Sequence, residues 1–181
     1  MLRWSVSYAK AEFILASLHN ASGDIQKNAF RGRLKHLKRL GIPLNSAPGR
    51  GKKIDYFEDD LLQWALCLEF AEFGMDPTTI VRFVETNWVK ILPRFKKCGA
   101  TQTSDDDVFL IAHPNLMSAS WDGNEESVAF KWLQLSDSNL FLARLGRSTP
   151  RRAIVVNISQ LYREMQFARM QFDSVSAKSE V

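Results

Sequence analysis

The residues of this sequence best suited to binding chemistry are nine lysines and arginines that lie close together between positions 24 and 54. They are Lys27, Arg31, Arg33, Lys35, Lys38, Arg39, Arg50, Lys52 and Lys53. Asp24 is the one acidic residue in this segment, so nine positive charges against one negative charge give +8, while the whole chain carries only +4. Concentrated positive charge favours binding to polyphosphates, because each neutralised phosphate releases condensed counterions. The plainer alternative is a solvated helix face, although such faces usually mix charges of both signs.

Four of the nine cations recur at spacings of four, four and three residues, which is typical of one face of a helix. They are Lys27, Arg31, Lys35 and Lys38. Like charges four residues apart destabilise an isolated helix by a few tenths of a kcal/mol per pair. We therefore expect an anionic partner that offsets the repulsion along this stripe.

The elements that position these cations are expected to be helices separated by short turns. Ser7 is a suitable N-cap for a helix that reaches residue 19. Ser22 or Asp24 is a suitable N-cap for a second helix, which Gly41 and Pro43 end near residue 40. The apolar face expected on this second helix is formed by Ile25, Phe30, Leu34 and Leu37.

Two further helices are expected after a glycine-containing turn. The glycines in residues 48–56 predict a short hairpin with a basic tip. Residues 58–73 then predict a largely buried helix, opened by acidic residues and closed by Gly74 in the left-handed conformation. Asp76 is the expected N-cap of a fourth helix, which ends before Pro93.

The second half of the sequence predicts an α+β arrangement. Residues 94–107 are mostly polar or charged and are typical of a linker. Short apolar runs predict four strands, at residues 108–112, 128–135, 140–145 and 153–156. The two middle strands are expected to form a hairpin around residues 136–139. Asn157 begins a capping-box-like motif for a last helix that reaches residue 172.

Composition argues against several classes of function. No apolar run approaches the roughly 18 residues of a membrane span, so we expect no membrane association. The two cysteines lie in apolar or basic surroundings that fit a reducing cytoplasm, so we expect a cytoplasmic location. Two cysteines and three histidines lack metal-ligand spacing, so neither a metal nor another cofactor is expected. The three aspartates at residues 105–107 fit a solvated linker, with a Mg²⁺-dependent nuclease as the alternative. Cys98 lies near Lys96 and Lys97, where a redox sensor is the alternative to an inert thiol. We expect no enzyme.

Five motifs in a fixed order carry a resemblance to a known family. The basic helix of residues 28–38 is followed by Arg39-Leu-Gly-Ile-Pro43, Gly49-Arg-Gly-Lys-Lys53, Tyr56-Phe-Glu-Asp-Asp-Leu61 and Phe73-Gly-Met-Asp-Pro-Thr-Thr-Ile80. In this order and spacing, residues 8–92 resemble the DNA-binding domain of the MerR-like winged-helix regulators. Compact proteins of this type occur in bacteria and phages. The sequence departs from the family where Arg31-Gly-Arg33 replaces its Arg-Tyr-Tyr motif, and in lacking its long coiled-coil helix.

The resemblance implies a division of the chain. Residues 1–93 would form a winged helix-turn-helix unit of four helices plus a wing hairpin, and residues 94–107 a linker. Residues 108–173 would form a small α+β dimerisation or interaction domain, with an antiparallel sheet and a C-terminal helix. Residues 174–181 would form a flexible tail.

The resemblance also implies that the basic helix enters the major groove of double-stranded DNA. Asn and Gln pair with adenine and Arg with guanine, each worth about 1–3 kcal/mol of discrimination. The candidate base readers are Gln26, Lys27, Asn28 and Arg31. Lys35, Lys38 and Arg39, toward the end of this helix, are expected to hold phosphates. The other candidate DNA-binding residues on the helix are Arg33 and His36. The candidate wing contacts are Arg50, Lys52 and Lys53. For His36 a solvated helix residue is the alternative.

A second copy of the chain is expected in the complex. One winged helix covers a short site, so specific binding predicts a homodimer on an inverted repeat. The candidate self-association residues on the last helix are Leu161, Met165, Phe167, Met170 and Phe172. The alternative is that both faces of this helix pack on strands of the same subunit.

These expectations together describe a nucleoid-associated transcription regulator, most simply a repressor. Within the same class, an excisionase-like recombination accessory factor is the alternative. Outside it, the alternative is a protein-interaction module whose partner docks on residues 108–172.

Overall fold

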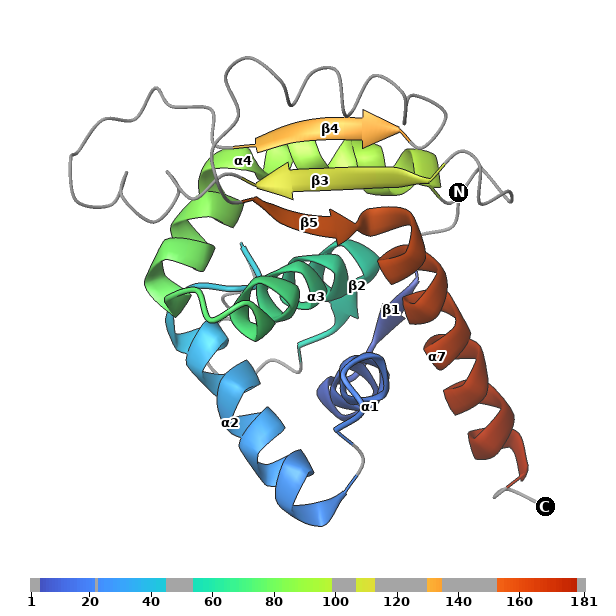
Figure 1. The fold of residues 1–181 in the computed structure, drawn as a ribbon. Coiled ribbons are helices and arrows are strands. Elements are labelled where there is room, and N and C mark those ends of the chain that lie inside the picture. Colours follow the sequence, from blue (N-terminus) through green and yellow to red (C-terminus); the bar gives the residue numbers. More distant parts are fainter. Residues whose placement is uncertain are drawn as a thin grey trace. The chain divides into compact units, whose positions relative to one another are not determined.

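The computed structural model describes residues 4–21, 23–44, 54–98, 107–112, 130–134 and 153–178 (Figure 1). Within these ranges the chain forms five helices, one two-stranded sheet and one three-stranded sheet. Both sheets are antiparallel, which confirms the α+β class. The chain divides into two compact units, one formed by Met1–Leu68 with Arg163–Val181 and the other by Glu69–Tyr162.

A pair of two-residue strands begins the first unit. β1 (Ser5–Val6) pairs antiparallel with β2 (Tyr56–Phe57), so the chain returns to its start after the expected wing. Neither strand is apparent from the sequence, because two residues are too few to show an alternating pattern. Ser7 follows β1 and caps α1 (Tyr8–Leu18), as expected, by accepting a hydrogen bond from a backbone N–H in the first turn.

The basic segment forms α2 (Asp24–Arg39), close to the expected bounds. Its N-cap is Gly23, and Asp24 is the first helical residue, so the expectation of a capping Asp24 is wrong. Ser22 lies outside the described residues. In place of a side-chain cap, Gln26 Oε1 accepts a hydrogen bond of 3.3 Å from the Gly23 N–H. That contact satisfies one of the backbone donors that every helix start leaves unpaired.

The central helix of this unit is α3 (Glu58–Glu72), whose residues from Glu69 onward belong to the second unit. Asp60 opens it by accepting a 2.8 Å hydrogen bond from the backbone N–H of Phe57. Residues 61–68 of the helix are all buried, which confirms the expected core helix. Gly74 follows with φ of +76°, the left-handed conformation that only glycine adopts without strain.

The second unit begins its main helix, α4 (Pro77–Cys98), as expected but ends it later. Asp76 Oδ1 accepts 3.0 Å hydrogen bonds from the N–H groups of the second and third helical residues, which confirms it as the N-cap. The expected end before Pro93 is wrong, because the helix continues to Cys98. Burial of Phe95 and Cys98 beyond the proline stabilises the extra turn, and this outweighs the one helix hydrogen bond that the proline ring removes.

The three-stranded sheet of the second unit has the order β4-β3-β5. Its central strand, β3 (Val108–Ala112), has the bounds expected from the sequence. β4 (Phe130–Gln134) lies within its expected segment, and β5 (Ile154–Asn157) ends one residue beyond the expected 153–156. Both flank β3, and Leu110 lies opposite both Trp132 and Val156. The other expected strand, at residues 140–145, and its turn at 136–139 lie outside the described residues.

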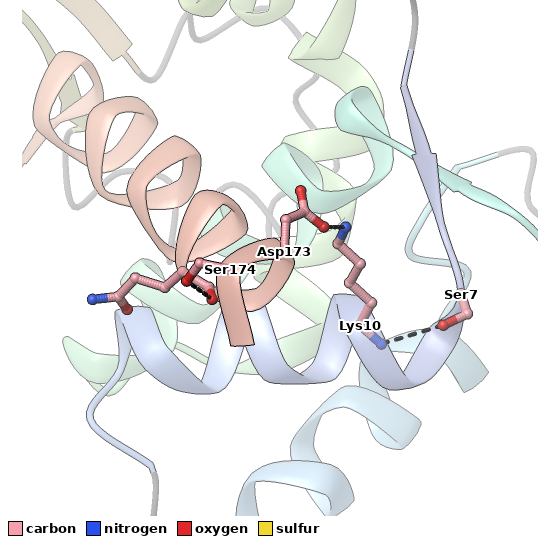
Figure 2. Close-up of polar contacts among 5 residues, drawn as sticks. Ser7, Lys10, Asp173 and Ser174 are labelled. Atoms are coloured by element: carbon pink, nitrogen blue, oxygen red, sulfur yellow. Dashed lines mark hydrogen bonds and ion pairs between the residues drawn. The ribbon is translucent and has the colours of Figure 1, made fainter. Parts of the chain in front are cut away.

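The last helix, α7 (Ile158–Lys178), begins where the sequence predicts and is longer than expected. Asn157 Oδ1 accepts a 2.9 Å hydrogen bond from the backbone N–H of Gln160, which confirms Asn157 as the cap. Contacts with α1 accompany the extension beyond residue 172. The ring of Phe172 packs edge-on against Phe13 at 5.1 Å, and Asp173 pairs with Lys10 (Figure 2).

The two units differ from the division expected at residues 93 and 108. Residues 94–98 belong to α4 rather than to a linker. The guanidinium of Arg94 lies 5.6 Å from the Trp132 ring of β4, and Cys98 Sγ lies 3.1 Å from Ser159 Oγ at the start of α7. The later part of α7 belongs with the N-terminal helices, as its contacts with α1 show.

Candidate nucleic-acid interface

The basic helix α2 presents one buried seam and a wide exposed surface. Phe30, Leu34 and Leu37 form the seam, each at most 4% exposed. Ile25 was expected in this seam, but it is 88% exposed, so that expectation is wrong. Ile25 precedes Phe30 by five residues, which turns its side chain well away from the seam on a helix of 3.6 residues per turn.

Arg31 is held by a carboxylate of the same unit. Its Nε lies 3.0 Å from both carboxylate oxygens of Glu12 on α1, and its Nη2 lies 2.7 Å from Oε1. These hydrogen bonds raise the pKa of Arg31 above its already high usual value. Glu12 is the only acidic residue of α1, and its side chain is 14% exposed. The contact joins α1 to α2 and engages an expected base reader within the chain.

Lys38 is also directed into the molecule. Its Nζ donates a 2.8 Å hydrogen bond to the hydroxyl of Tyr56, which is 1% exposed. The same ammonium lies 5.6 Å from the ring centre of Tyr56 and 5.9 Å from that of Tyr8. Trp64 completes this aromatic cluster, with its ring centre 5.0 Å from Tyr56. Lys38 therefore fastens α2 to β2, a role that differs from the phosphate contact expected of it.

The tyrosine of α1 in this cluster has an unusual environment. The Tyr8 hydroxyl is buried and has no hydrogen-bond partner among the described residues. Burial, followed by the nearby carboxylate of Glu12, raises the pKa of Tyr8 above 10.0. One feature of the sequence indicates these contacts, because α1 has a single acidic residue and α2 has six cations.

Two of the other candidates on α2 contact groups of the same helix. Arg39 Nη2 lies 2.7 Å from Nδ1 of His36, so His36 is neither isolated nor simply solvated. Gln26 is occupied in capping the helix, as described above. Lys27 and Arg33 are exposed.

The side of α2 opposite the buried seam carries a different line of residues from the stripe expected. We call it the outward stripe: Asn28, Gly32, Lys35 and Arg39, at spacings of four, three and four residues, all exposed. Gly32 is in the helix interior, where glycine costs about 1 kcal/mol relative to alanine. The expected stripe shares only Lys35 with it, because Arg31 and Lys38 turn toward α1 and β2.

The expected wing contacts Arg50, Lys52 and Lys53 lie outside the described residues. The described segment that follows them is β2, which pairs with β1. β2 is paired with β1, and its Tyr56 accepts the hydrogen bond from Lys38 of α2. The residues that follow the expected wing are therefore fixed to the N-terminal strand and to α2.

The five candidate self-association residues fall into three groups on α7. Leu161 and Met165 are 5% and 0% exposed, so they belong to the core and that part of the expectation is wrong. Phe172 packs on Phe13. Phe167 and Met170 are 58% and 61% exposed, and they remain candidates for contact with a second molecule.

The described residues give little support to the two alternative chemistries, a redox sensor at Cys98 and a nuclease at residues 105–107. Cys98 is 2% exposed, whereas a sensor thiol must be accessible. Asp107 accepts a 2.8 Å hydrogen bond from Asn157 Nδ2, and its two acidic neighbours lie outside the described residues. Among the residues with described positions, no three His, Cys, Asp or Glu side chains gather as a metal site, and no helix has the length and hydropathy to cross a bilayer.

Comparison with known proteins adds no family to these observations. No protein-family model matches the chain, and no curated protein sequence matches it. The resemblance of residues 8–92 to MerR-like regulators therefore remains a prediction.

Proposed function

We propose that the protein is a sequence-specific regulator of transcription that binds double-stranded DNA through α2. The observation that carries the proposal is the exposed surface of α2, which presents Lys35 and Arg39 in line with Asn28. Lysine and arginine hold phosphates and asparagine reads adenine, so one line of residues supplies both affinity and specificity.

The proposed binding mode is that of a winged helix-turn-helix of the MerR-like type. α1 and the turn before Gly23 support α2, which lies in the major groove. Arg31 and Lys38 contribute indirectly, because their contacts with Glu12 and Tyr56 fix α2 to its neighbours. The basic residues of 50–53 contact the flanking backbone or minor groove.

A salt titration tests the proposal. Arg31 and Lys38 make contacts within the chain, and the segment of residues 24–54 carries nine cations in all. With five or six of them engaged, the slope of log affinity against log salt should be about −5 for duplex DNA. The affinity is measured by fluorescence anisotropy of a labelled duplex at several salt concentrations between about 50 and 200 mM. A flat slope would reject DNA binding.

A charge-reversal pair localises the interface. Lys35→Glu should weaken binding by at least tenfold and make the salt slope shallower by roughly one unit or more, because a phosphate contact is lost. Lys90→Glu is the matched control, since Lys90 is exposed on α4. Equal effects of the two substitutions would show that only net charge matters.

Selection from a random duplex pool tests sequence specificity. An enriched inverted repeat, with loss of preference at one base pair per half-site in Asn28→Ala, is the expected result. The same enriched site distinguishes a repressor from the excisionase-like alternative. A repressor lowers expression from a promoter that carries the site, whereas the alternative bends the DNA and leaves the promoter unaffected.

The proposed homodimer uses two exposed apolar residues of α7, Phe167 and Met170. Phe167 and Met170 lie three residues apart, on the side of the helix away from buried Met165. Phe167→Ser with Met170→Ser should convert a dimer to a monomer in sedimentation equilibrium and reduce affinity for an inverted repeat. The same exposure favours the second candidate function, a protein-interaction module. A protein-interaction module is indicated if the wild-type protein is monomeric and if Phe167→Ser, but not Lys35→Glu, abolishes the effect of the protein when it is expressed in cells.

A further inference from the structure

Nothing in the described part of the chain explains the interior glycine of α2, Gly32. Gly41 and Gly74 adopt φ values of +102° and +76°, where glycine is required. Gly32 has no such φ, and a Cβ built on it meets no atom within 4 Å. Neither backbone conformation nor packing among the described residues calls for glycine here.

The surroundings of Gly32 indicate what the missing side chain leaves room for. It lies within the outward stripe, one turn from Asn28 and from Lys35 and two turns from Arg39. A polar side chain thus flanks bare backbone on each side along the helix, short at Asn28 and long at Lys35. Glycine is the residue that permits the closest approach of a ligand to the backbone.

We propose that Gly32 is the point of closest approach between α2 and DNA, and that the outward stripe, rather than the Lys27–Lys38 stripe, is the groove-facing surface. This inference rests on the proposed function. Asn28 then lies toward the base edges, while Lys35 and Arg39 reach the phosphates beyond. From Asn28 to Arg39 the stripe is about 16 Å long at 1.5 Å per residue, enough to cross a major groove about 12 Å wide.

Two substitutions at Gly32 test the inference, because alanine and leucine favour the helix and add bulk in steps. Gly32→Ala should raise the thermal midpoint by about 2–4 °C and yet weaken DNA binding, by roughly fivefold. Gly32→Leu should weaken binding by 30-fold or more, the upper range for bulk forced into a tight contact. The thermal midpoint shows that both variants are folded.

Matched controls on another helix separate bulk from helix stability. Thr86 is exposed on α4, so Thr86→Ala and Thr86→Leu alter helix propensity and size away from the stripe. Both should leave DNA affinity within twofold of wild type. Asn28→Leu supplies a positive control within the stripe and should remove the preference at the one base pair per half-site that Asn28 reads.

The outcomes separate this inference from the function on which it rests. If wild type binds duplex DNA with the expected salt slope and Gly32→Leu binds equally well, then the close approach at Gly32 is wrong while the proposed function stands. If wild type binds no duplex at 50 mM salt, the proposed function fails, and the inference fails with it. A loss of affinity on Gly32→Leu with no change on Thr86→Leu supports both.

Discussion

The contact between Lys38 and Tyr56 makes a quantitative prediction about stability. Tyr56→Phe removes a hydrogen bond to a charged group, which costs about 1.5 kcal/mol. Lys38 is an exposed residue, so its ammonium can regain water and no further penalty is expected. Lys38→Met removes the same hydrogen bond and also leaves the buried Tyr56 hydroxyl unsatisfied, which raises the expected cost to about 2.5 kcal/mol with the lost cation–π contact.

The double variant is the informative one. With both partners replaced by apolar groups, no polar group is left orphaned, and the expected cost is only about 1.5 kcal/mol. The free energy of unfolding should therefore fall by much less than the two single effects combined. Urea unfolding followed by tryptophan fluorescence measures it, because Trp64 packs against Tyr56. The single variants should lower the thermal midpoint by about 3–10 °C.

Two results would refute this reasoning. Additivity of the two substitutions within about 0.5 kcal/mol would show that the residues are not coupled. A salt slope that becomes shallower by about 0.9 in Lys38→Met, with Tyr56→Phe unaffected, would return Lys38 to the phosphate contact expected from the sequence. Lys35→Met is the matched control on the same helix: stability should be within 0.5 kcal/mol of wild type, while the salt slope changes.

The remaining predictions concern three other sites. Tyr8→Phe should raise the free energy of unfolding by about 1 kcal/mol, since it removes a buried hydroxyl that lacks a described partner and keeps the ring contacts. Because the pKa of Tyr8 is raised above 10.0, wild type should lose stability as the pH rises beyond 10; in thermal unfolding at several pH values, an equal loss in the variant would contradict this. Asp76→Ala should cost about 1 kcal/mol in urea unfolding through loss of the α4 cap, and no change would count against the cap. Burial raises the pKa of the Cys67 thiol, and Cys98 is also buried. Mass spectrometry should therefore find both thiols unmodified by iodoacetamide until urea is added. Rapid labelling of Cys98 in the native protein would instead support the redox-sensor alternative.

Local signals in the sequence were enough to locate most helix ends. Ser7, Gly74 and Asp76 each act through residues at most a few positions away, so their roles follow from residue type and spacing. The central strand β3 is similarly a short apolar run bounded by polar residues. The end of α4 was missed because burial of Phe95, a tertiary effect, overrides the local influence of Pro93.

The candidate site was only partly predictable, because its cations differ in their partners and not in their type. Periodicity placed Lys27, Arg31, Lys35 and Lys38 on one stripe, but a stripe of charges does not show which of them meets a carboxylate. Arg31 contacts a residue 19 positions earlier, and Lys38 contacts one 18 positions later. Such pairs depend on how helices and strands meet, which no local pattern encodes.

The return of α7 to the N-terminal helices has a consequence for synthesis of the protein on the ribosome. Figure 2 shows Asp173 of α7 meeting Lys10 of α1, and Gln166 Nε2 donates a 2.5 Å hydrogen bond to Glu58 Oε1 at the start of α3. These contacts unite residues translated more than a hundred positions apart. The first unit therefore cannot complete its fold until residues 69–162 have been synthesised and α7 has left the ribosome. Until then, the surface of residues 1–68 that contacts α7 stays uncovered.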